Sequence, residues 1–407
     1  MAEGGKALVV AGESSGDIYA SRLIAALKKL RPSIEVYGVG GSAMRDVGTR
    51  LIADIKDLST FGIFEVFRLL PKIIGIFFRV LFSIKREKPD LVILIDYPDF
   101  NLRLAGFIRL FYGRAVKILY YITPQVWIWR KRRAKTLVKR SDRLAVVFPF
   151  EEALFSKLGA KVDFVGHPLL ETIPSSLDRN ELVKYFGLDP SRRTIALLPG
   201  SRHAEIRNYL PTMIKAVRDL EKDGKYQFLI ARAQTISEDE MAGSLSEAGV
   251  NVRQIGGETQ KVLKVADLAV VALGTATLES ALMGTPAILV GWVRPLTSWV
   301  GKKFLGMDLP YYSLVNFIIG RRAYPELIQY EMTPENIARS VRELTGNPMA
   351  MEVLRNAARE TQELLWGPER AVERASLPSG GQEKNDYHLS ASGRVAIIAD
   401  KMIGVSP

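Results

Sequence analysis

The sequence predicts an α/β protein with two doubly wound parallel sheets. Short runs of aliphatic and β-branched residues recur along the chain, and each run is followed by a stretch with helical spacing. Runs that are apolar throughout are typical of parallel strands with helices on both faces. The alternation stops in a polar stretch after residue 168 and then restarts, and 407 residues exceed the length of about 250–300 at which a single core usually divides. Two tandem units are therefore the simplest architecture.

The first unit is expected within residues 1–170. It begins with a strand over 6–12 (KALVVAG) and a helix over 17–30, and a second strand follows at 36–41 (VYGVGG). These strands combine residues of high β propensity with glycine at their ends. Further strands of this unit are expected at 90–96, 116–123, 143–148 and 162–166.

The second unit is expected within residues 171–345, after a polar loop and a charged helix over 178–186. No sequence repeat relates it to the first unit. Residues 346–407 are expected to form helices, with a loop or linker over 367–386 that is rich in Pro, Gly and charge, and a last apolar helix over 393–403. The strands of the second unit are expected at 194–199, 227–231, 251–255, 267–273 and 287–292.

The composition limits both the partners and the chemistry. Lys and Arg number 56 against 44 Asp and Glu, and a formal charge of +12 calls for an anionic partner: nucleic acid, phospholipid headgroups or a phosphorylated substrate. The sequence has no Cys, which excludes disulfides, thiolate metal sites and cysteine nucleophiles. His167, His203 and His388 have no metal-ligand spacing, so no metal site is expected. The start of the chain lacks the pattern of a signal peptide, and secretion is not expected.

The turn after the first strand has the composition of a binding loop. Its two glycines allow a tight backbone path, its serines can cap the following helix, and its free amides face whatever is bound there. The alternative is a capped turn without a ligand, and the Lys-Ser/Thr of a nucleoside-triphosphate loop is missing. The residues of this turn are Gly12, Glu13, Ser14, Ser15 and Gly16.

Two carboxylates close a hydrophobic strand in the segment 95–101 (IDYPDFN). Asp96 and Asp99 are well placed to act as a general base on a hydroxyl, because Pro98 fixes the turn between them. The alternative is that Asp99 caps a helix beginning at Asn101. Placing acids so close to an apolar strand costs free energy, and a catalytic function would explain why they are there.

Two strand ends in the second unit indicate a nucleotide site. The segments 198–202 (LPGSR) and 274–279 (GTATLE) each follow a strand and open a helix, whose free amides attract anions. Two such termini on neighbouring strands suit a diphosphate, and the acid one turn into the second helix can hold ribose hydroxyls. Plain capping is the alternative. The candidate residues are Ser201, Arg202, Gly274, Thr275, Ala276 and Glu279.

A glycine pattern at 38–43 (GVGGSA) fits a loose dinucleotide-binding motif. It follows the second strand instead of the first, and no clear acidic strand end lies about 20 residues further on. A nicotinamide or flavin cofactor is therefore not expected.

The most apolar region, 64–84, is interrupted by three basic residues and a proline, which argues against a membrane-spanning helix. On a helix, Lys72, Arg79 and Arg86 form one basic stripe, and apolar residues cover most of the remaining circumference. Such a helix either lies between two packed layers or rests in a membrane interface. The expected membrane-facing residues are Leu69, Lys72, Ile73, Ile76, Phe77, Arg79 and Val80.

A second basic segment, 130–143, carries eight basic residues and one acidic residue after an aromatic stretch. Aromatic and basic residues together can bind nucleic acid. No nucleic-acid-binding motif accompanies them, so a solvated or membrane-facing helix is the favoured interpretation and no nucleic-acid partner is expected.

Eight motifs, in order along the chain, resemble the lipid-A-disaccharide synthase family. The resemblance covers residues 7 to about 340, and no other family known to us carries this combination. The motifs are AGESSGD (11–17), FGIFEV (61–66), IDYPDFN (95–101), TPQVWIWR (123–130), VGHPL (165–169), LPGSR (198–202), GTATLE (274–279) and VNFIIGRR (315–322).

The resemblance implies an inverting, metal-independent glycosyltransferase of the GT-B type, with two Rossmann-like domains facing a cleft. It implies transfer from UDP-2,3-diacylglucosamine to 2,3-diacylglucosamine 1-phosphate through a β(1→6) bond, with release of UDP and no cofactor. By motif position, Asp99 is the catalytic base, Asp96 supports it, and Glu13 is an essential acid of the first loop. Arg202, Glu279 and Asn316 fall on the family's donor side.

The resemblance also implies a Gram-negative, cytoplasmic protein that is peripheral on the anionic inner face of the inner membrane, as a monomer or homodimer. The C-terminal helices would cross back to the first unit or exchange between subunits, although 367–389 is longer and more polar than the family pattern. Two alternatives stay open: another GT-B enzyme such as a UDP-N-acetylglucosamine 2-epimerase, and a non-catalytic protein that binds anionic lipid.

Overall fold

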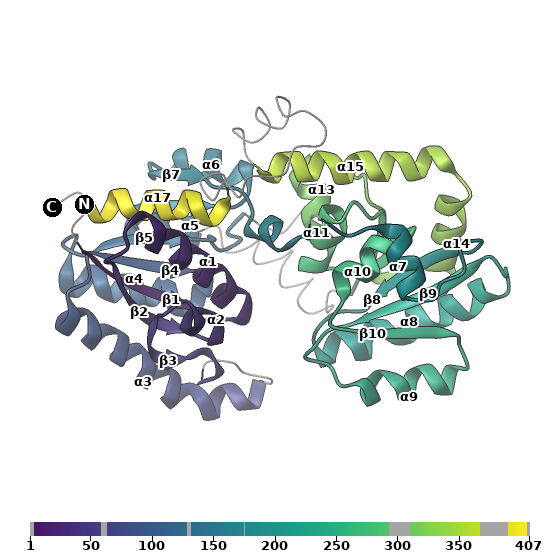
Figure 1. Ribbon diagram of the computed structural model, residues 1–407, viewed down its shortest axis with the longest axis horizontal. Helices are drawn as coiled ribbons and strands as arrows, with labels where there is room; N and C mark the ends of the chain where they lie inside the picture. Colours follow the sequence, from purple (N-terminus) through teal and green to yellow (C-terminus); the bar gives the residue numbers. More distant parts are fainter. Residues whose placement is uncertain are drawn as a thin grey trace. The chain divides into compact units, whose positions relative to one another are not determined.

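A computed structural model describes residues 4–57, 63–127, 132–174, 176–292, 310–366 and 390–404. The chain forms two compact units (Figure 1). Unit 1 comprises residues Met1–Glu171 together with Leu365–Pro407, and unit 2 comprises Thr172–Leu364. The chain therefore leaves unit 1 once and returns to it near its end.

Unit 1 contains a seven-stranded parallel sheet in the order β3-β2-β1-β4-β5-β6-β7. The central strands are apolar throughout, and all five residues of β4 are fully buried, as expected for a sheet covered on both faces. The strands are β1 (Lys6–Ala11), β2 (Glu35–Gly40), β3 (Arg50–Asp54), β4 (Leu91–Ile95), β5 (Lys117–Tyr121), β6 (Arg143–Val146) and β7 (Val162–Phe164).

Helices lie on both sides of this sheet (Figure 1). In the longest of them, α3, side chains are described from Pro71 onward. The helices of unit 1 are α1 (Ser14–Leu30), α2 (Ser42–Asp46), α3 (Ile63–Glu87), α4 (Pro98–Tyr112), α5 (Arg132–Arg140), α6 (Pro149–Ser156) and α17 (Ala391–Gly404), with 3-10 turns at Ile55–Asp57 and Pro168–Thr172.

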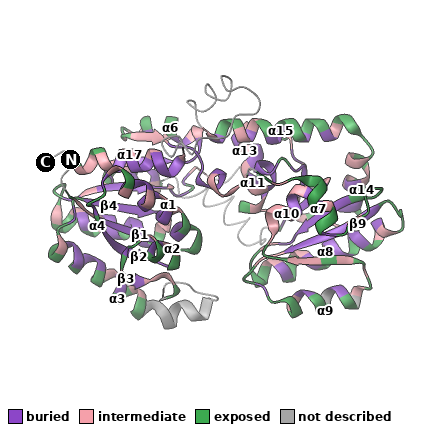
Figure 2. Ribbon diagram, in the orientation of Figure 1, coloured by how far each residue is buried: buried purple, intermediate pink, exposed green. Residues whose placement is uncertain are grey.

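Unit 2 contains a six-stranded parallel sheet in the order β10-β9-β8-β11-β12-β13. Counted within the unit, this order matches the first six positions of the sheet in unit 1. Figure 2 shows buried strands and exposed residues on the helices around them in both units. The strands are β8 (Arg193–Leu198), β9 (Tyr226–Arg232), β10 (Val252–Gly256), β11 (Leu268–Ala272), β12 (Ala287–Gly291) and β13 (Glu326–Ile328).

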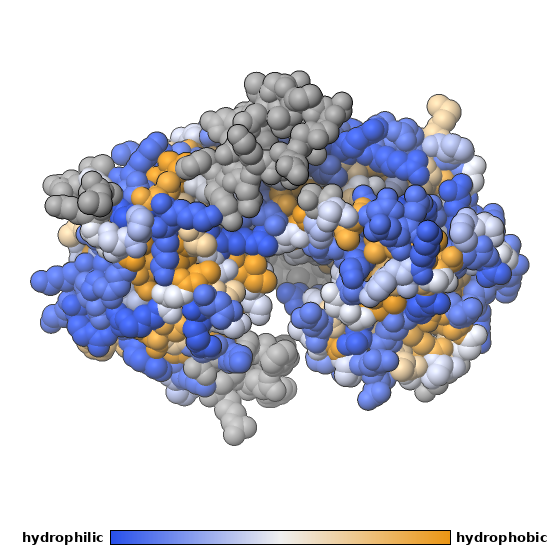
Figure 3. Space-filling model, in the orientation of Figure 1, coloured by the Kyte–Doolittle hydropathy of each residue, from blue (hydrophilic) through white to orange (hydrophobic). Residues whose placement is uncertain are grey.

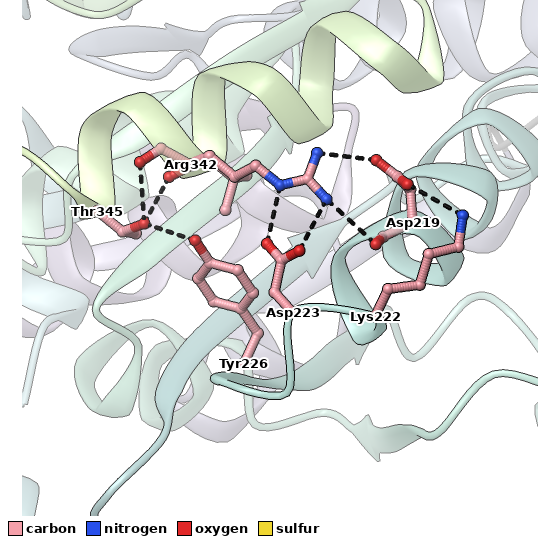
Figure 4. Close-up of polar contacts among 7 residues, drawn as sticks. Asp219, Lys222, Asp223, Tyr226, Arg342 and Thr345 are labelled. Atoms are coloured by element: carbon pink, nitrogen blue, oxygen red, sulfur yellow. Dashed lines mark hydrogen bonds and ion pairs between the residues drawn. The ribbon is translucent and has the colours of Figure 1, made fainter.

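The helices of unit 2 cover this second sheet. The network that fixes α14 to α8 is drawn in Figure 4, where the guanidinium of Arg342 donates to Asp219 (2.8 Å) and Asp223 (2.8 Å). These bonds lower the pKa of both carboxyls. The helices are α7 (Arg179–Tyr185), α8 (His203–Glu221), α9 (Glu238–Ala248), α10 (Thr259–Val265), α11 (Thr275–Leu282), α13 (Leu314–Ile319), α14 (Pro334–Thr345) and α15 (Pro348–Trp366), with a 3-10 turn at Gln329–Glu331.

The prediction of two doubly wound α/β units is confirmed. Two strands were not predicted, β3 and β13, and both lie at a sheet edge. Each pairs with a single neighbour and is only partly buried, so neither has the continuously apolar sequence of the inner strands.

The segment 346–407, whose helices were expected to cross back or exchange between subunits, is divided between the two units. Most of α15 belongs to unit 2, whereas α17 packs on α1 of the same chain (Figure 1). Three apolar residues of α17 are fully buried there, and Arg31, which directly follows α1, donates to Asp400 at 2.8 Å. The predicted linker 367–386 lies outside the described residues.

Candidate functional site

The loop after β1 packs against the turn after β4. Gly12 is buried, and a Cβ atom at this position would lie 2.2 Å from the ring of Tyr97. Only glycine therefore fits between the two segments. Glu13, Ser14 and Ser15 are exposed beside this contact, and Gly16 is buried at the start of α1.

Asp17 fixes the glycine loop that follows β2. Its side chain is only 4% exposed, and its carboxylate accepts from the backbone amides of Gly41 (2.6 Å), Ala43 (3.0 Å) and Met44 (3.1 Å). The amides that a dinucleotide phosphate would need in a GxGxxG loop are thus occupied by a side chain of the protein. Asp17 was not predicted as a functional residue, although it ends the motif 11–17.

The turn after β4 has an unusual backbone. Asp96 and Tyr97 have φ angles of 46° and 45°, in the left-handed region that costs an ordinary residue about 1–2 kcal/mol. Asn101 holds this turn, because its fully buried amide donates to the carbonyls of Ile95 (3.1 Å) and Asp96 (2.8 Å). The hydroxyl of Tyr120 donates to the Asp96 carbonyl as well. The acidic turn is therefore fixed before any ligand binds.

The three acids predicted in unit 1 come together at this turn. Burial and the negative charge of Glu13 raise the pKa of Asp96 to about 6. Asp99 lies in the first turn of α4, with 66% of its side chain exposed, and accepts from the guanidinium of Arg133 at 2.5 Å. Residue 97 caps α4, so the alternative role of Asp99 as the helix cap is wrong.

In unit 2, a pocket of about 360 Å³ opens where β8 and β11 end. All six residues predicted for the nucleotide site from the two strand ends lie in its lining. They are joined by Gly200, Glu205, Ala231, Ala233, Thr259 and three residues at the ends of the strands. The lining includes Ser201, Arg202, Gly274, Thr275, Ala276 and Glu279.

Glu205 orients the loop that carries the arginine. Its carboxylate accepts from the amides of Ser201 (2.9 Å) and Arg202 (3.2 Å) and from the Arg202 guanidinium (3.1 Å). Gly200 has a φ of 118°, and a Cβ there would lie 2.4 Å from the Glu205 carboxylate, so the close approach requires glycine. The side chain of Arg202 is 82% exposed and is available to a ligand. Glu205 was not predicted, although an acid three residues after a helix start is a capping signal.

Glu279 lines the pocket, where burial raises its pKa and a hydrogen bond from Gln260 opposes that rise. Asn316, predicted on the donor side, lies outside this lining. It is fully buried, and its amide bonds the backbone of Ala323 and Tyr324 and the carboxylate of Glu326. Among the described residues it supports the segment 313–326 and does not line the pocket.

The apolar surface of unit 1 lies on a different face of α3 from the one predicted. Ile76 and Val80 are fully buried, because they pack against the sheet, and Ile73 and Phe77 are half-buried. Lys72 and Arg79 are exposed as expected, and the side chain of Leu69 lies outside the described residues. The large apolar residues that are exposed on α3 and the adjoining α4 are Ile74, Phe78, Phe82, Phe107, Leu110 and Phe111.

These six residues are called the apolar patch below, and the four phenylalanines among them belong to one aromatic cluster. The ring of Phe77 lies edge-on to those of Phe78 (6.0 Å between centroids) and Phe107 (5.2 Å), so it joins the two helices. Apolar areas interrupt the hydrophilic surface of both units on the face drawn in Figure 3. Across the described ranges, no helix is both long and apolar enough to cross a membrane.

The basic run 130–143 does not form one free basic surface. Its first two residues lie outside the described residues. Arg133 pairs with Asp99, Arg140 donates to a backbone carbonyl of α4, and Arg143 pairs with a carboxylate of β7. The exposed basic residues that remain are Arg132, Lys135 and Lys139.

Comparison with known proteins supports the resemblance seen in the motifs. A family model described as lipid-A-disaccharide synthetase matches residues 7–367. A lipid-A-disaccharide synthase of Syntrophus aciditrophicus is 41% identical over 372 residues, which is 91% of this chain and 96% of that protein. One of Geobacter metallireducens is 37% identical over 365 residues, covering 88% of this chain and 93% of that protein.

Solved structures with the same fold are more distant in sequence. The UDP-GlcNAc 2-epimerase of Neisseria meningitidis, bound to UDP-GlcNAc, matches with a TM-score of 0.61 at 12% identity over 91% of this chain and 99% of the other. The calicheamicin glycosyltransferase matches with a TM-score of 0.55 at 14% identity, over 91% and 97%. These two likenesses show the GT-B fold.

Proposed function

The chain belongs to the lipid-A-disaccharide synthase family, and from that premise we propose how its residues carry out the reaction. The protein is a glycosyltransferase that joins UDP-2,3-diacylglucosamine to 2,3-diacylglucosamine 1-phosphate and releases UDP. The comparisons do not favour the epimerase alternative, since the epimerases match in fold at 12% identity whereas the synthases match at 35–41%.

The pocket of unit 2 holds the UDP portion of the donor. Arg202 and the free amides at the start of α11 neutralise the diphosphate, both on binding and as it departs. Glu279 accepts hydrogen bonds from the ribose hydroxyls. The observation that carries this assignment is that residues from two separate strand ends line one pocket of about 360 Å³.

Asp99 acts as the general base of unit 1. Its exposed carboxylate takes the proton of the acceptor 6-hydroxyl while that oxygen bonds to the anomeric carbon of the donor. The bond from the anomeric carbon to the diphosphate breaks on the opposite face, and UDP leaves with the electron pair. Asp96 supports this base from the same turn, where burial and the charge of Glu13 raise the pKa of Asp96 itself.

The apolar patch docks the protein on an anionic membrane, on the inner face of the inner membrane where the acylated substrates reside. Six large apolar side chains are exposed together, and Lys72, Arg79, Lys85 and Arg86 of α3 are exposed on the same helix. Apolar insertion and attraction to anionic headgroups act together in such interfacial contacts.

The catalytic assignment is tested by measuring UDP release from the purified protein with the two acylated substrates. Release is expected only when donor and acceptor are both present. Conversion of UDP-GlcNAc without an acceptor would instead support an epimerase. A failure to release UDP with both acylated substrates would contradict the proposed reaction.

Docking is tested with liposomes. Phe78→Ser and Phe111→Ser are expected to weaken flotation with anionic vesicles, because each removes an exposed apolar ring from the patch. Tyr330→Ser is the matched control, since Tyr330 of unit 2 is 88% exposed and lies outside the patch. Liposome binding that neither requires anionic lipid nor weakens with added salt would contradict the docking proposal.

A further inference from the structure

A pocket of unit 1 lies at the amino ends of β4 and β5. Its volume is about 430 Å³, within the range of about 300–1,000 Å³ that is common for small-molecule sites. It is formed by the ends of α3 and α4, by the turns that lead from them to β4 and β5, and by Ile403 of α17. The acidic turn follows the carboxyl end of β4, so the length of this strand separates the pocket from the proposed base.

The pocket is basic. Lys85, Lys88 and Lys117 line it, against a single acid, Asp90. Asp90 already accepts from the backbone amide of Lys6 at 2.8 Å, and Lys117 donates to a backbone carbonyl of α17 at 2.8 Å. Lys85 and Lys88 are exposed, and within the described ranges no hydrogen bond or ion pair holds either ammonium group. Two positive charges are therefore open to an anion that enters the pocket.

The backbone of Lys88 is strained for a residue of its type. Its φ angle is 48°, in the left-handed region that favours glycine, and glycine is the usual residue where a helix ends in this way. The helix dipole does not require a lysine here, because a helix end carries only about half a charge and the last turn of α3 already contains Lys85 and Arg86. A function of the Lys88 side chain would explain why lysine occupies this position.

The apolar patch extends along both helices to the pocket. Phe82 lies one turn before Lys85 on α3 and is 69% exposed, and Phe111 directly precedes Tyr112 of the pocket lining and is 63% exposed. The hydroxyl of Tyr112 donates to the carbonyl of Leu81 at 3.3 Å, which joins the ends of the two helices. A basic pocket beside exposed aromatic rings matches an anionic phospholipid, which has a charged headgroup and apolar chains.

We propose that this pocket binds the phosphate-bearing headgroup of an anionic phospholipid through the ammonium groups of Lys85 and Lys88, while the chains of the same lipid lie against the apolar patch. The proposal rests on the membrane docking proposed above and adds to it a site for a single lipid molecule. Binding then depends on the position of these two lysines and not only on the net charge of α3.

The test is calorimetric titration with dicaproylphosphatidylglycerol, a short-chain phospholipid, below its critical micelle concentration. No bilayer is present, so the surface potential of a vesicle does not contribute. Lys85→Ala and Lys88→Ala are each expected to weaken binding by about 10- to 100-fold, the range for one charge-assisted contact. Arg86→Ala is the matched control, because it removes an exposed positive charge from the same turn of α3 but lies outside the pocket lining. It should leave binding unchanged.

Lys88→Gly separates lipid binding from folding. Glycine adopts a φ angle of 48° without strain, so this variant should melt no lower than the wild type and should still lose lipid affinity. UDP release in detergent should stay unchanged in all of these variants, since none of the substituted residues belongs to the acidic turn or to the pocket of unit 2.

Equal weakening in Arg86→Ala and in the two lysine variants would overturn the inference, because net charge alone would then explain binding. Inorganic phosphate that binds as tightly as the short-chain lipid would also overturn it, since the chains would contribute nothing. Flotation of the wild type with anionic vesicles, combined with unaltered lipid affinity in the lysine variants, would refute the pocket and leave the docking proposal intact. A wild type that binds the short-chain lipid but does not float would refute the docking proposal alone.

Discussion

The two units share one strand order but differ in the charge that they place at the equivalent edge of the sheet. In unit 1 the segments after β1 and β4 carry Glu13, Asp96 and Asp99. In unit 2 the segments after β8 and β11 carry glycines, hydroxyl groups and Arg202. Both edges offer helix N-termini, which attract negative charge. Unit 1 supplies that charge from its own side chains. Unit 2 does so only at the start of α8, through Glu205, and leaves the start of α11 open.

The difference shows that the shared strand order fixes where these loops lie, whereas the residues in each loop determine its chemistry. Asp17 makes this clear, because it occupies three amides around the start of α2 that would otherwise be open to an anion. Glu205 of unit 2 likewise binds amides at the start of α8, but it leaves most of the Arg202 side chain exposed.

The largest effect that tests this comparison is expected at Asp99. Asp99→Asn removes the base and should lower kcat by about 10²- to 10⁴-fold, while UDP affinity stays unchanged because unit 2 is untouched. Asp46→Asn, at an exposed acid of the same unit, is the control and should leave kcat as it is. UDP release and UDP titration calorimetry measure the two quantities. A parallel loss of UDP binding would show that the acids of unit 1 also serve the donor.

Arg202→Ala should produce the next largest effect, and it should change UDP affinity instead of kcat. The loss of one charge-assisted contact to the diphosphate is expected to weaken UDP binding by about 10- to 100-fold. Arg207→Ala on the same helix is the control, since that exposed arginine is not part of the pocket lining. Unaltered UDP affinity in Arg202→Ala would show that Arg202 does not contact the bound UDP.

Asp96 should show how much the clustering of acids in unit 1 lowers the stability of the folded state. Its pKa is raised from the usual 3.8 to about 6, so the unfolded state loses its proton first as the pH rises. The carboxyl contributes almost nothing below about pH 3, where both states are protonated, and it destabilises the folded state increasingly up to about pH 6. Asp96→Asn should therefore raise the free energy of unfolding at pH 7.5 by up to about 3 kcal/mol, and by almost nothing at about pH 3.

Denaturant unfolding of Asp96→Asn at the two pH values provides the measurement. An equal gain at both pH values would mean that the charge of Asp96 is not the cause.

The smallest effect is expected away from either site, in the ion pairs of Figure 4. Arg342→Ala removes ion pairs that are partly exposed to solvent, so the melting temperature should fall by only about 1–3 °C. Because the pKa values of Asp219 and Asp223 are lowered, this contribution is present at neutral pH and is lost in acid. Arg339→Ala on the same helix is the control. A difference that persists at pH 2 would contradict an electrostatic origin.

The inner strands of both sheets were predictable because burial on two faces demands an unbroken apolar run, as in β4 and β11. The strands β3 and β13 were not, because each is only partly buried and its short sequence, RLIAD or ELI, includes charged residues. The nucleotide pocket was predictable for a similar reason: residues directly after parallel strands meet at one edge.

Contacts between segments that are far apart in the chain could not be predicted from the sequence. The pairing of Arg133 with Asp99 depends on how α5 packs on α4, and nothing local to either residue indicates it. The face of α3 was misjudged because its apolar residues surround the helix, so periodicity could not tell that Ile76 and Val80 face the sheet while Phe78 and Phe82 face solvent. Asn101 was read as the start of a helix, and its role in the acidic turn follows only from its burial.

The return of α17 to α1 has a consequence for the order in which the protein is made. Unit 2 is one continuous stretch of chain, so it can fold as soon as it has left the ribosome. Unit 1 is not continuous: its first 171 residues must wait through the synthesis of the whole of unit 2 before the helix that covers α1 arrives. During that interval the apolar surface beneath α17 is open, and the nascent chain is most exposed to aggregation and most dependent on chaperones.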